Sequence, residues 1–380
     1  MKRPAVLALA AVLAIWCWQF ATVHFNYGGN WTAFFCIAPE WPQPAFVASE
    51  KLYTFPGSGY DGQMYHLIAH DPFMRRGAVA AMDDPPLRYR RILVPALAWA
   101  LALGRDSAVH FTYFAVVLGS IFLGVYWLAR ALEIQGRHPA WGLMFVLMPG
   151  VLVSMDRMTV DVGLAALTAG FVLYSDSSRW KILLILVCAA LTRETGLLLT
   201  LGYGIFLLSR RRFGDSIWTA ATALPAMIWY AYVRSQTPPE PPSAFGSLVP
   251  LGGWIERVAH PFVYNLPHWP ALAATELDYV ALAGVALMLG HAVWLAWNRR
   301  WNARAAAIYV FAAAIVFIGS RSVWEDAFGY GRVITPLMIL LAADDARPRL
   351  AFASVVLVDA RIGLNFLKQI HGVIRGLVGI

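Results

Sequence analysis

The sequence predicts an all-α protein that crosses a lipid bilayer many times. Of its 380 residues, 59% are hydrophobic and only 14% are charged, against roughly 45–50% and 25% in a soluble domain. The mean hydropathy is +0.58, and long apolar runs recur along the whole chain. So few charges cannot coat two or three soluble globules, so we expect one transmembrane domain over 1–380.

The first apolar run, 5–23, follows Lys2 and Arg3, and this basic start predicts a cytoplasmic N-terminus. Trp16 and Trp18 stand where a signal peptide would have small residues at its cleavage site, so we interpret the run as an uncleaved span. Further apolar runs cover 108–130, 140–153, 159–175, 180–191, 195–208, 216–233, 279–298, 303–319, 332–343 and 350–366. Several are shorter than the about 20 residues of an isolated span, which suits a bundle of about 10–11 transmembrane helices.

The short run 92–103 decides the topology. If it crossed the membrane, every later loop would change side, and the arginine clusters at 210–212 and 299–300 would face outward. The preference of basic residues for the cytoplasmic side favours instead a helix that lies at the outer surface. Two large extracytoplasmic loops result, 24–107 with membrane-lying helices and 234–278.

Cysteines and common catalytic motifs carry little information in this chain. The three cysteines lie far apart and show neither metal-ligand nor disulfide spacing. The sequence has no nucleophile elbow, no Gly-rich phosphate loop and no dinucleotide fingerprint. His66 and His70 have the spacing of a metal pair, but no glutamate stands between them as in a zinc protease, so we expect no metal there.

Arginine dominates the basic residues, with 26 Arg against 4 Lys. A GC-rich genome would explain this excess. Alternatively, the planar guanidinium is the better group for gripping phosphate.

The segment 59–71 holds the first group of charges at an expected membrane boundary. Asp61 lies where a helix would begin, and Met64, Leu67 and Ile68 follow with the spacing of one apolar helix face. This pattern is typical of a helix that lies on the membrane. Asp61 would then serve either as a helix N-cap or as a general base.

The second group of charges combines two acidic and three basic residues. Asp83 and Asp84 precede two prolines, and Arg88, Arg90 and Arg91 follow them. The adjacent carboxylates could hold a divalent cation on a phosphate. They could also pair with the arginines as a salt-bridge belt, or the arginines could meet lipid headgroups.

Two more groups stand at expected outer turns. Asp156, Arg157 and Asp161 lie between two apolar runs, and Thr192-Arg193-Glu194 interrupts another. The last group also includes Arg321, Glu325, Asp326, Tyr330 and Arg332. Charges near lipid are costly, so their gathering on one face of the membrane indicates a functional site.

The chain resembles the GT-C superfamily of integral-membrane glycosyltransferases. The resemblance rests on a long first outer loop with an acidic residue early on a surface helix, here Asp61 within Tyr60-Asp61-Gly62-Gln63. It also rests on Pro85-Pro86-Leu87 leading into 92–103, and on the turn Thr192-Arg193. Many members have Asp-Glu where this chain has Asp61-Gly62, so Asp83-Asp84 is an alternative position for the acidic pair.

The resemblance implies an inverting transfer of a sugar from a polyprenyl-phosphate donor to a glycan, glycolipid or protein acceptor. The reaction would take place on the periplasmic side of a bacterial inner membrane, without nucleic acid and without a cofactor, unless a divalent cation sits at Asp83 and Asp84. Asp61 is the expected base, with Asp84 and Asp83 as alternatives. The arginines expected on the donor phosphate are Arg88, Arg90, Arg91, Arg157, Arg193, Arg321 and Arg332. The expected sugar or acceptor contacts are Gln63, Tyr65, His66, Asp156, Glu194 and Tyr330.

Two other functional classes stay open at this point. A transporter or flippase of a lipid-linked or anionic substrate would place charges near the bilayer midplane and show internal symmetry, and neither is evident here. A non-catalytic subunit of an envelope-glycopolymer assembly complex would use the outer loops for docking and would tolerate loss of the Asp61 carboxylate.

Overall fold

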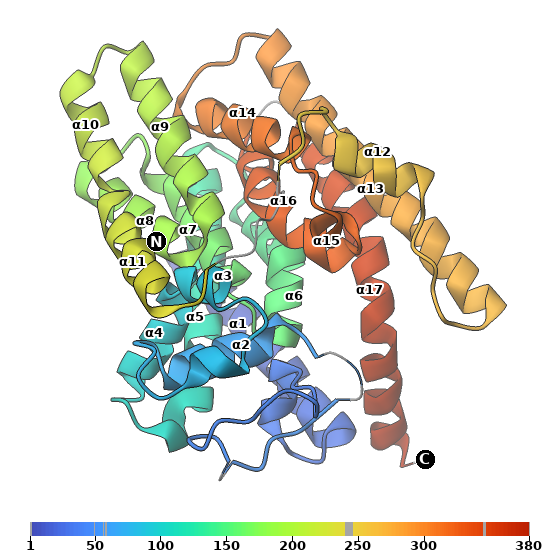
Figure 1. Cartoon of the computed structure of the whole chain (residues 1–380). Helices are drawn as coiled ribbons and strands as arrows, with labels where there is room; N and C mark the ends of the chain where they lie inside the picture. The colour runs from blue at the N-terminus through green and yellow to red at the C-terminus, as the bar shows by residue number, and fades with distance from the viewer. Residues whose placement is uncertain are drawn as a thin grey trace.

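The computed structural model describes residues 2–48, 50–55, 57, 59–239, 246–344 and 347–379. Within these ranges every regular element is a helix, as expected (Figure 1). Two isolated backbone bridges, between Ile37 and Thr54 and between Gly246 and Ile318, tie loop segments together. The proline-rich start of the second large loop lies partly outside the described residues.

Four helices are long and apolar enough to cross a bilayer. They are α1 (Lys2–Asn26), α5 (Asp106–Ile134), α13 (His268–Trp297) and α17 (Pro348–Val378). The 3-10 helix η3 (Pro139–Leu147) and α6 (Pro149–Arg157) form a fifth crossing if this pair, bent by 58°, counts as one span. The chain is therefore a multi-pass membrane protein.

The other apolar runs form helices that are too short to cross a bilayer alone. They are α7 (Asp161–Tyr174), α8 (Arg179–Thr192), α9 (Leu197–Ser209), α14 (Ala303–Val316) and α16 (Ala327–Ala342). The run expected as one helix over 216–233 is divided into α10 (Phe213–Ala221) and α11 (Leu224–Gln236). By length, then, four or five of the expected ten or eleven segments are full spans, and the rest are short helices packed in the bundle.

The first large loop contains η1 (Trp31–Phe35), α2 (Asp61–His70), η2 (Ala78–Ala81), α3 (Pro85–Arg90) and α4 (Leu93–Leu101). With nine residues, α4 is only about 13 Å long, far short of a span. The helix α2 is buried on all sides from Gly62 to His70. The expectation of a single apolar face was wrong for α2, because α3, α4, α5 and η1 pack around it.

Segments expected on the inner side meet at one end of the bundle. The turn between α9 and α10 and the turn between α13 and α14 lie together at the top of Figure 1, with α2 and α4 toward the opposite end. Arg137, before η3, donates to the carbonyl oxygens of Ala342 and Asp344 at 3.0 and 3.2 Å, and Arg304 donates to Ala343. These arginines cap the C-terminus of α16, where the helix dipole favours cations.

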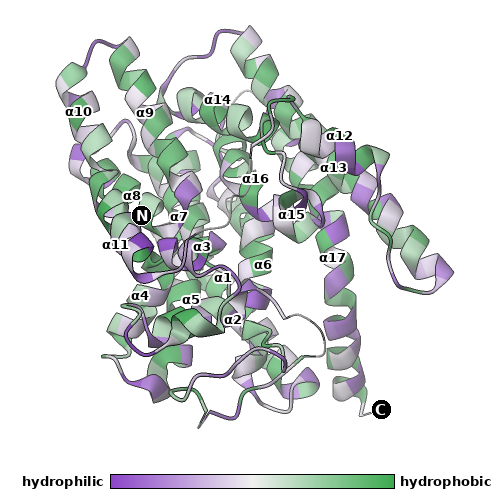
Figure 2. Ribbon diagram, viewed as in Figure 1, coloured by the Kyte–Doolittle hydropathy of each residue, from purple (hydrophilic) through white to green (hydrophobic). Residues whose placement is uncertain are grey.

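Hydrophobic residues cover most of the bundle helices (Figure 2). Large apolar side chains such as Leu184, Trp218 and Ile228 are exposed on the outside of the molecule. Such a surface is costly in water and suits hydrocarbon. The remaining elements are short: η4 (Glu194–Gly196), α12 (Gly252–Ala259) and α15 (Arg321–Trp324).

Candidate active site

Asp61 is the first residue of α2 and lies between two guanidinium groups. Its Oδ1 is 3.0 Å from Nη1 of Arg88 on α3, and its Oδ2 accepts a hydrogen bond from Nη1 of Arg332 on α16. The N-cap residue of α2 is Tyr60, so Asp61 is not the cap of its helix. Its side chain is 15% exposed.

The ion-pair network continues from Arg332 to the N-terminus of α7. Nη1 of Arg332 lies 3.8 Å from Oδ2 of Asp161, and Oδ1 of Asp161 accepts a hydrogen bond from Arg193 at the end of α8. Both Asp161 and Arg193 are buried. Since a buried charge is tolerated only when it is paired, these contacts fix the ends of α7, α8 and α16 relative to one another.

Arg88 and Arg91 extend the network in two further directions. Arg88 donates to both carboxylate oxygens of Asp83, at 2.9 and 2.6 Å. Arg91 binds Glu194 of η4 at 2.6 Å and donates to the Tyr65 hydroxyl at 3.0 Å. We call the whole set the arginine–carboxylate network. Its members are Asp61, Asp83, Asp161, Glu194, Arg88, Arg91, Arg193 and Arg332, whose formal charges sum to zero.

The network controls the basicity of Asp61. Burial alone would raise the pKa of the Asp61 carboxyl, but the guanidinium groups of Arg332 and Arg88 outweigh this effect and hold the pKa below its usual range. Asp61 is therefore ionised, and its negative charge is shared with two cations. It becomes a stronger base when another anion takes one of those cations.

Arg157 joins the site through aromatic rings. Its guanidinium lies 4.6 Å from the ring centroid of Tyr60 and 4.5 Å from that of Phe328, and Arg332 lies 5.1 Å from the same Tyr60 ring. Arg157 also pairs with Asp156 at 3.4 Å. Such stacking holds a guanidinium in place while leaving its donors available.

Gly62 explains how α2 approaches α6. A Cβ atom at this position would lie 2.2 Å from the carbonyl oxygen of Arg157 and 3.1 Å from that of Phe35. Only glycine allows this contact between backbones. A residue with a side chain could not follow Asp61 here without moving α2 away from α6.

Several residues expected at the site make contacts within the fold. Asp84 is the N-cap of α3 and accepts a hydrogen bond from the Leu87 amide at 3.2 Å. The side-chain oxygen of Gln63 accepts from the Ala38 amide at 3.0 Å. Asp156 accepts from Gln369 at 2.6 Å as well as pairing with Arg157. His66 faces His70 and Glu50.

Besides Arg157, two of the expected phosphate-binding arginines lie outside the network. Arg90 donates to the Pro86 carbonyl at 3.1 Å and lines a cavity of about 660 Å³ formed with α11. Arg321 is highly exposed and pairs with Glu256 at 3.0 Å.

Tyr330 lies beside a second buried charged cluster that sequence reasoning missed. Its ring stacks on Trp324, and within the described part of the chain its buried hydroxyl has no hydrogen-bond partner. Nearby, Asp278 binds Arg257 at 2.6 Å and Arg361 at 2.9 Å. Arg257 and Trp324 line a cavity of about 650 Å³.

Asp278 had a signal in the sequence that could have identified it. It directly precedes the apolar run 279–298, and a charge at the end of a membrane segment is costly unless it is paired. A neighbouring arginine is the usual partner for such a carboxylate.

The chain was compared with family models, with curated proteins and with solved structures, and none of the three gave a significant match, so its function is inferred from the site itself.

Proposed function

We propose that the protein is an inverting glycosyltransferase that moves a sugar from a polyprenyl-phosphate donor to an acceptor hydroxyl at the extracytoplasmic face of a bacterial inner membrane. One observation carries this proposal. A single carboxylate, Asp61, lies between Arg88 and Arg332 in a buried network built from five separate parts of the chain. The reaction needs one base beside several cations, and this arrangement supplies both.

The chemistry follows from these groups. The acceptor oxygen attacks the anomeric carbon and gives its proton to Asp61, while the bond from that carbon to the phosphate oxygen breaks and its electron pair goes to the phosphate. A carboxylate in hydrogen-bond reach acts well as such a base. Fixed guanidinium groups stabilise the negative charge that grows on the leaving phosphate.

The pairing of Asp61 with its two arginines predicts the order in which the two substrates bind. Before the donor binds, Arg88 and Arg332 are paired with Asp61 and hold its pKa low. A donor phosphate that binds either arginine weakens that pairing and raises the pKa of Asp61. In this proposal the donor binds first and makes Asp61 a better base for the acceptor.

The cavity between α3 and α11 is the proposed place for the first part of the polyprenyl chain. It measures about 660 Å³ and is lined by Pro86, Arg90, Tyr230, Val233 and Arg234, among others. Arg90 and Arg234 give this cavity two cations beside its apolar lining, which suits a lipid phosphate and the carbon chain attached to it.

The test is an assay of the purified protein in lipid nanodiscs with a panel of polyprenyl-phosphate sugars, comparing wild type, Asp61→Asn and Asp84→Asn. Removal of a general base costs about 10²–10⁴-fold in rate, so Asp61→Asn should lose sugar transfer while it still binds donor. Asp84→Asn should stay active, since asparagine also caps a helix.

Two results would refute the proposal that the protein is a glycosyltransferase. One is that no donor is bound or consumed by wild type. The other is that Asp61→Asn transfers sugar at the wild-type rate. Donor movement across proteoliposome membranes without transfer would indicate a flippase instead.

A further inference from the structure

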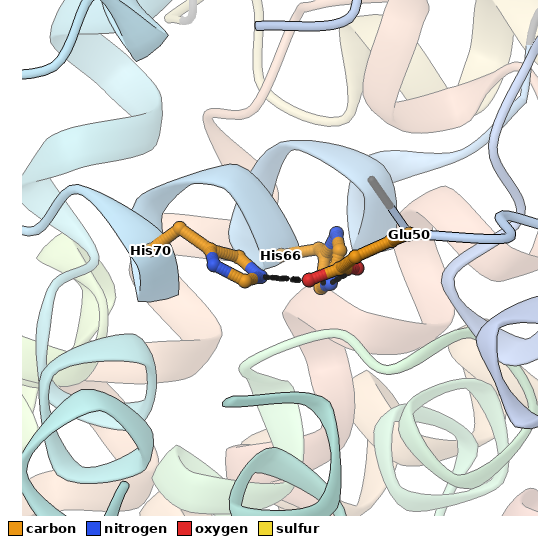
Figure 3. Close-up of side chains that lie close together, drawn as sticks. All are labelled: Glu50, His66 and His70. Carbon is orange, nitrogen blue, oxygen red and sulfur yellow. Dashed lines mark hydrogen bonds and ion pairs between the residues drawn. The ribbon is translucent and has the colours of Figure 1, made fainter. Parts of the chain in front are cut away.

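Three side chains in the first large loop come together outside the arginine–carboxylate network. Figure 3 shows Glu50, from the loop before α2, next to His66 and His70 on α2. The two Nε2 atoms are 3.2 Å apart. Oε1 of Glu50 lies 3.4 Å from Nε2 of His70, and Oε2 lies 3.6 Å from Nε2 of His66.

These separations are close to those in a tetrahedral metal site. Zn²⁺ binds histidine nitrogen and carboxylate oxygen at about 2.0–2.2 Å, so two ligands of a tetrahedral ion are roughly 3.3–3.5 Å apart. The two histidine contacts of Glu50 come from its two different oxygens. With one oxygen as the ligand, the three ligand atoms of Glu50, His66 and His70 lie within 4.8 Å of one another, which places all three within reach of one ion and leaves a fourth position open for water.

Asp106 fixes the orientation of the His70 ring. Its Oδ1 is 2.9 Å from Nδ1 of His70, and both of its oxygens also accept hydrogen bonds from Arg76 at 2.8 Å. An ionised carboxylate only accepts, so His70 donates through Nδ1 and its Nε2 carries the lone pair that faces the cluster. A carboxylate behind a histidine in this way is the usual support of a metal ligand.

The Glu50 carboxylate lacks the hydrogen bonds that burial requires. Both of its oxygens are buried, and neither accepts a hydrogen bond from any residue that the structure describes. An unpaired buried carboxylate next to the Nε2 lone pair of His70 is unfavourable unless a cation lies between them.

We propose that Glu50, His66 and His70 form a binding site for a divalent transition-metal ion, with Zn²⁺ as the ion that fits the ligand set best. Two histidines and one carboxylate with an open fourth position are a known zinc arrangement. The ion would join the loop around Glu50 to the C-terminal half of α2. It would thereby hold the helix whose first residue is Asp61, and this role does not depend on which reaction Asp61 performs.

The test is metal binding by the full-length, tag-free protein in detergent, stripped of metal with a chelator. Titration with Co²⁺, followed by its visible absorption, and with Zn²⁺, followed by calorimetry, should each show one equivalent. Zn²⁺ should also raise the Tm of the stripped protein, because it binds the folded state.

Glu50→Gln and His70→Gln should each weaken this binding by about 100-fold or more, because loss of a ligand costs at least as much as loss of a group that supports a ligand, which costs about 10–100-fold. The matched control is His291→Gln on α13, another buried histidine whose ring nitrogens have no partner among the described residues. It should bind Zn²⁺ as wild type does. The proposal is overturned if stripped wild type takes up no stoichiometric Zn²⁺, or if folded Glu50→Gln and His70→Gln both bind it with unchanged affinity.

Discussion

Arg332 on α16 donates a hydrogen bond to Asp61 on α2, although the two residues are 271 positions apart in the sequence. The same guanidinium lies 3.8 Å from Asp161. One arginine therefore bridges two carboxylates from two other helices, and it closes the network around Asp61.

Arg332→Lys should reduce kcat/KM for the lipid-linked donor by about 10²-fold, the usual cost of one lost charge-stabilising donor. Nη1 makes both carboxylate contacts, and an ammonium lacks the second Nη and the Nε–H that a guanidinium can offer to a phosphate. Initial rates at several donor concentrations measure the effect. The control is Arg321→Lys, since Arg321 is exposed and pairs only at the surface. Equal kcat/KM for the two variants would show that Arg332 is not on the reaction path.

Gly62→Ala should inactivate the protein or lower its Tm. Alanine normally favours a helix by about 1 kcal/mol over glycine, but here its Cβ would meet the Arg157 carbonyl oxygen at 2.2 Å. The start of α2, with Asp61, must then move away from α6. Gly119→Ala on α5 is the matched control, because nothing lies within 4 Å of its Cβ position. Its Tm should be unchanged or higher, and a Gly62→Ala protein with the same Tm and activity as wild type would contradict the close approach.

Glu194→Gln should destabilise the fold by about 3–5 kcal/mol, because it leaves the Arg91 guanidinium buried without its anion. Arg91 is almost fully buried and binds Glu194 at 2.6 Å. The double variant Arg91→Met with Glu194→Leu should be more stable than Arg91→Met alone or Glu194→Leu alone. The Tm of each variant, measured by thermal unfolding in the same detergent, tests this. If the effects of the two single changes simply add, the pair is not coupled.

At pH 5 and above, kcat/KM for the donor should not fall through protonation of Asp61. The pKa of this carboxyl is lowered in the free protein, after the arginines overcome the effect of burial. A lowered pKa means that the base is already ionised at pH 5, and that its activity is lost only below its ordinary pKa of about 3.9. Replacing Arg88 with Gln removes one of the two cations and should shift any acid limb toward higher pH. The ion pairing would be contradicted if kcat/KM of wild type fell as the pH dropped through neutrality while the residual activity of Asp61→Asn did not. That result would mean that the pKa of Asp61 is raised.

Much of the helical pattern could be predicted from the sequence, because hydrophobicity along a helix is a local property. Each apolar run corresponds to a helix or to a pair of helices, and the short run 92–103 forms the short helix α4. The break in 216–233 was not predicted, although Pro225 in the first turn of α11 marks the position where a new helix begins. The burial of α2 was not predicted either, because its neighbours come from other parts of the chain.

The sequence by itself determined the class of protein, all-helical and multi-pass, and it identified the charged turns where a site would have to lie. Both follow from composition and from the spacing of residues close together in the chain. Only the tertiary structure decided that Asp61 faces Arg88 and Arg332, that Asp84 caps a helix, and that Glu50 meets His66 and His70. An ion pair forms within a few ångströms, and the residues that come so close depend on how α16 packs against α6 and α7. No local pattern in the sequence specifies that packing.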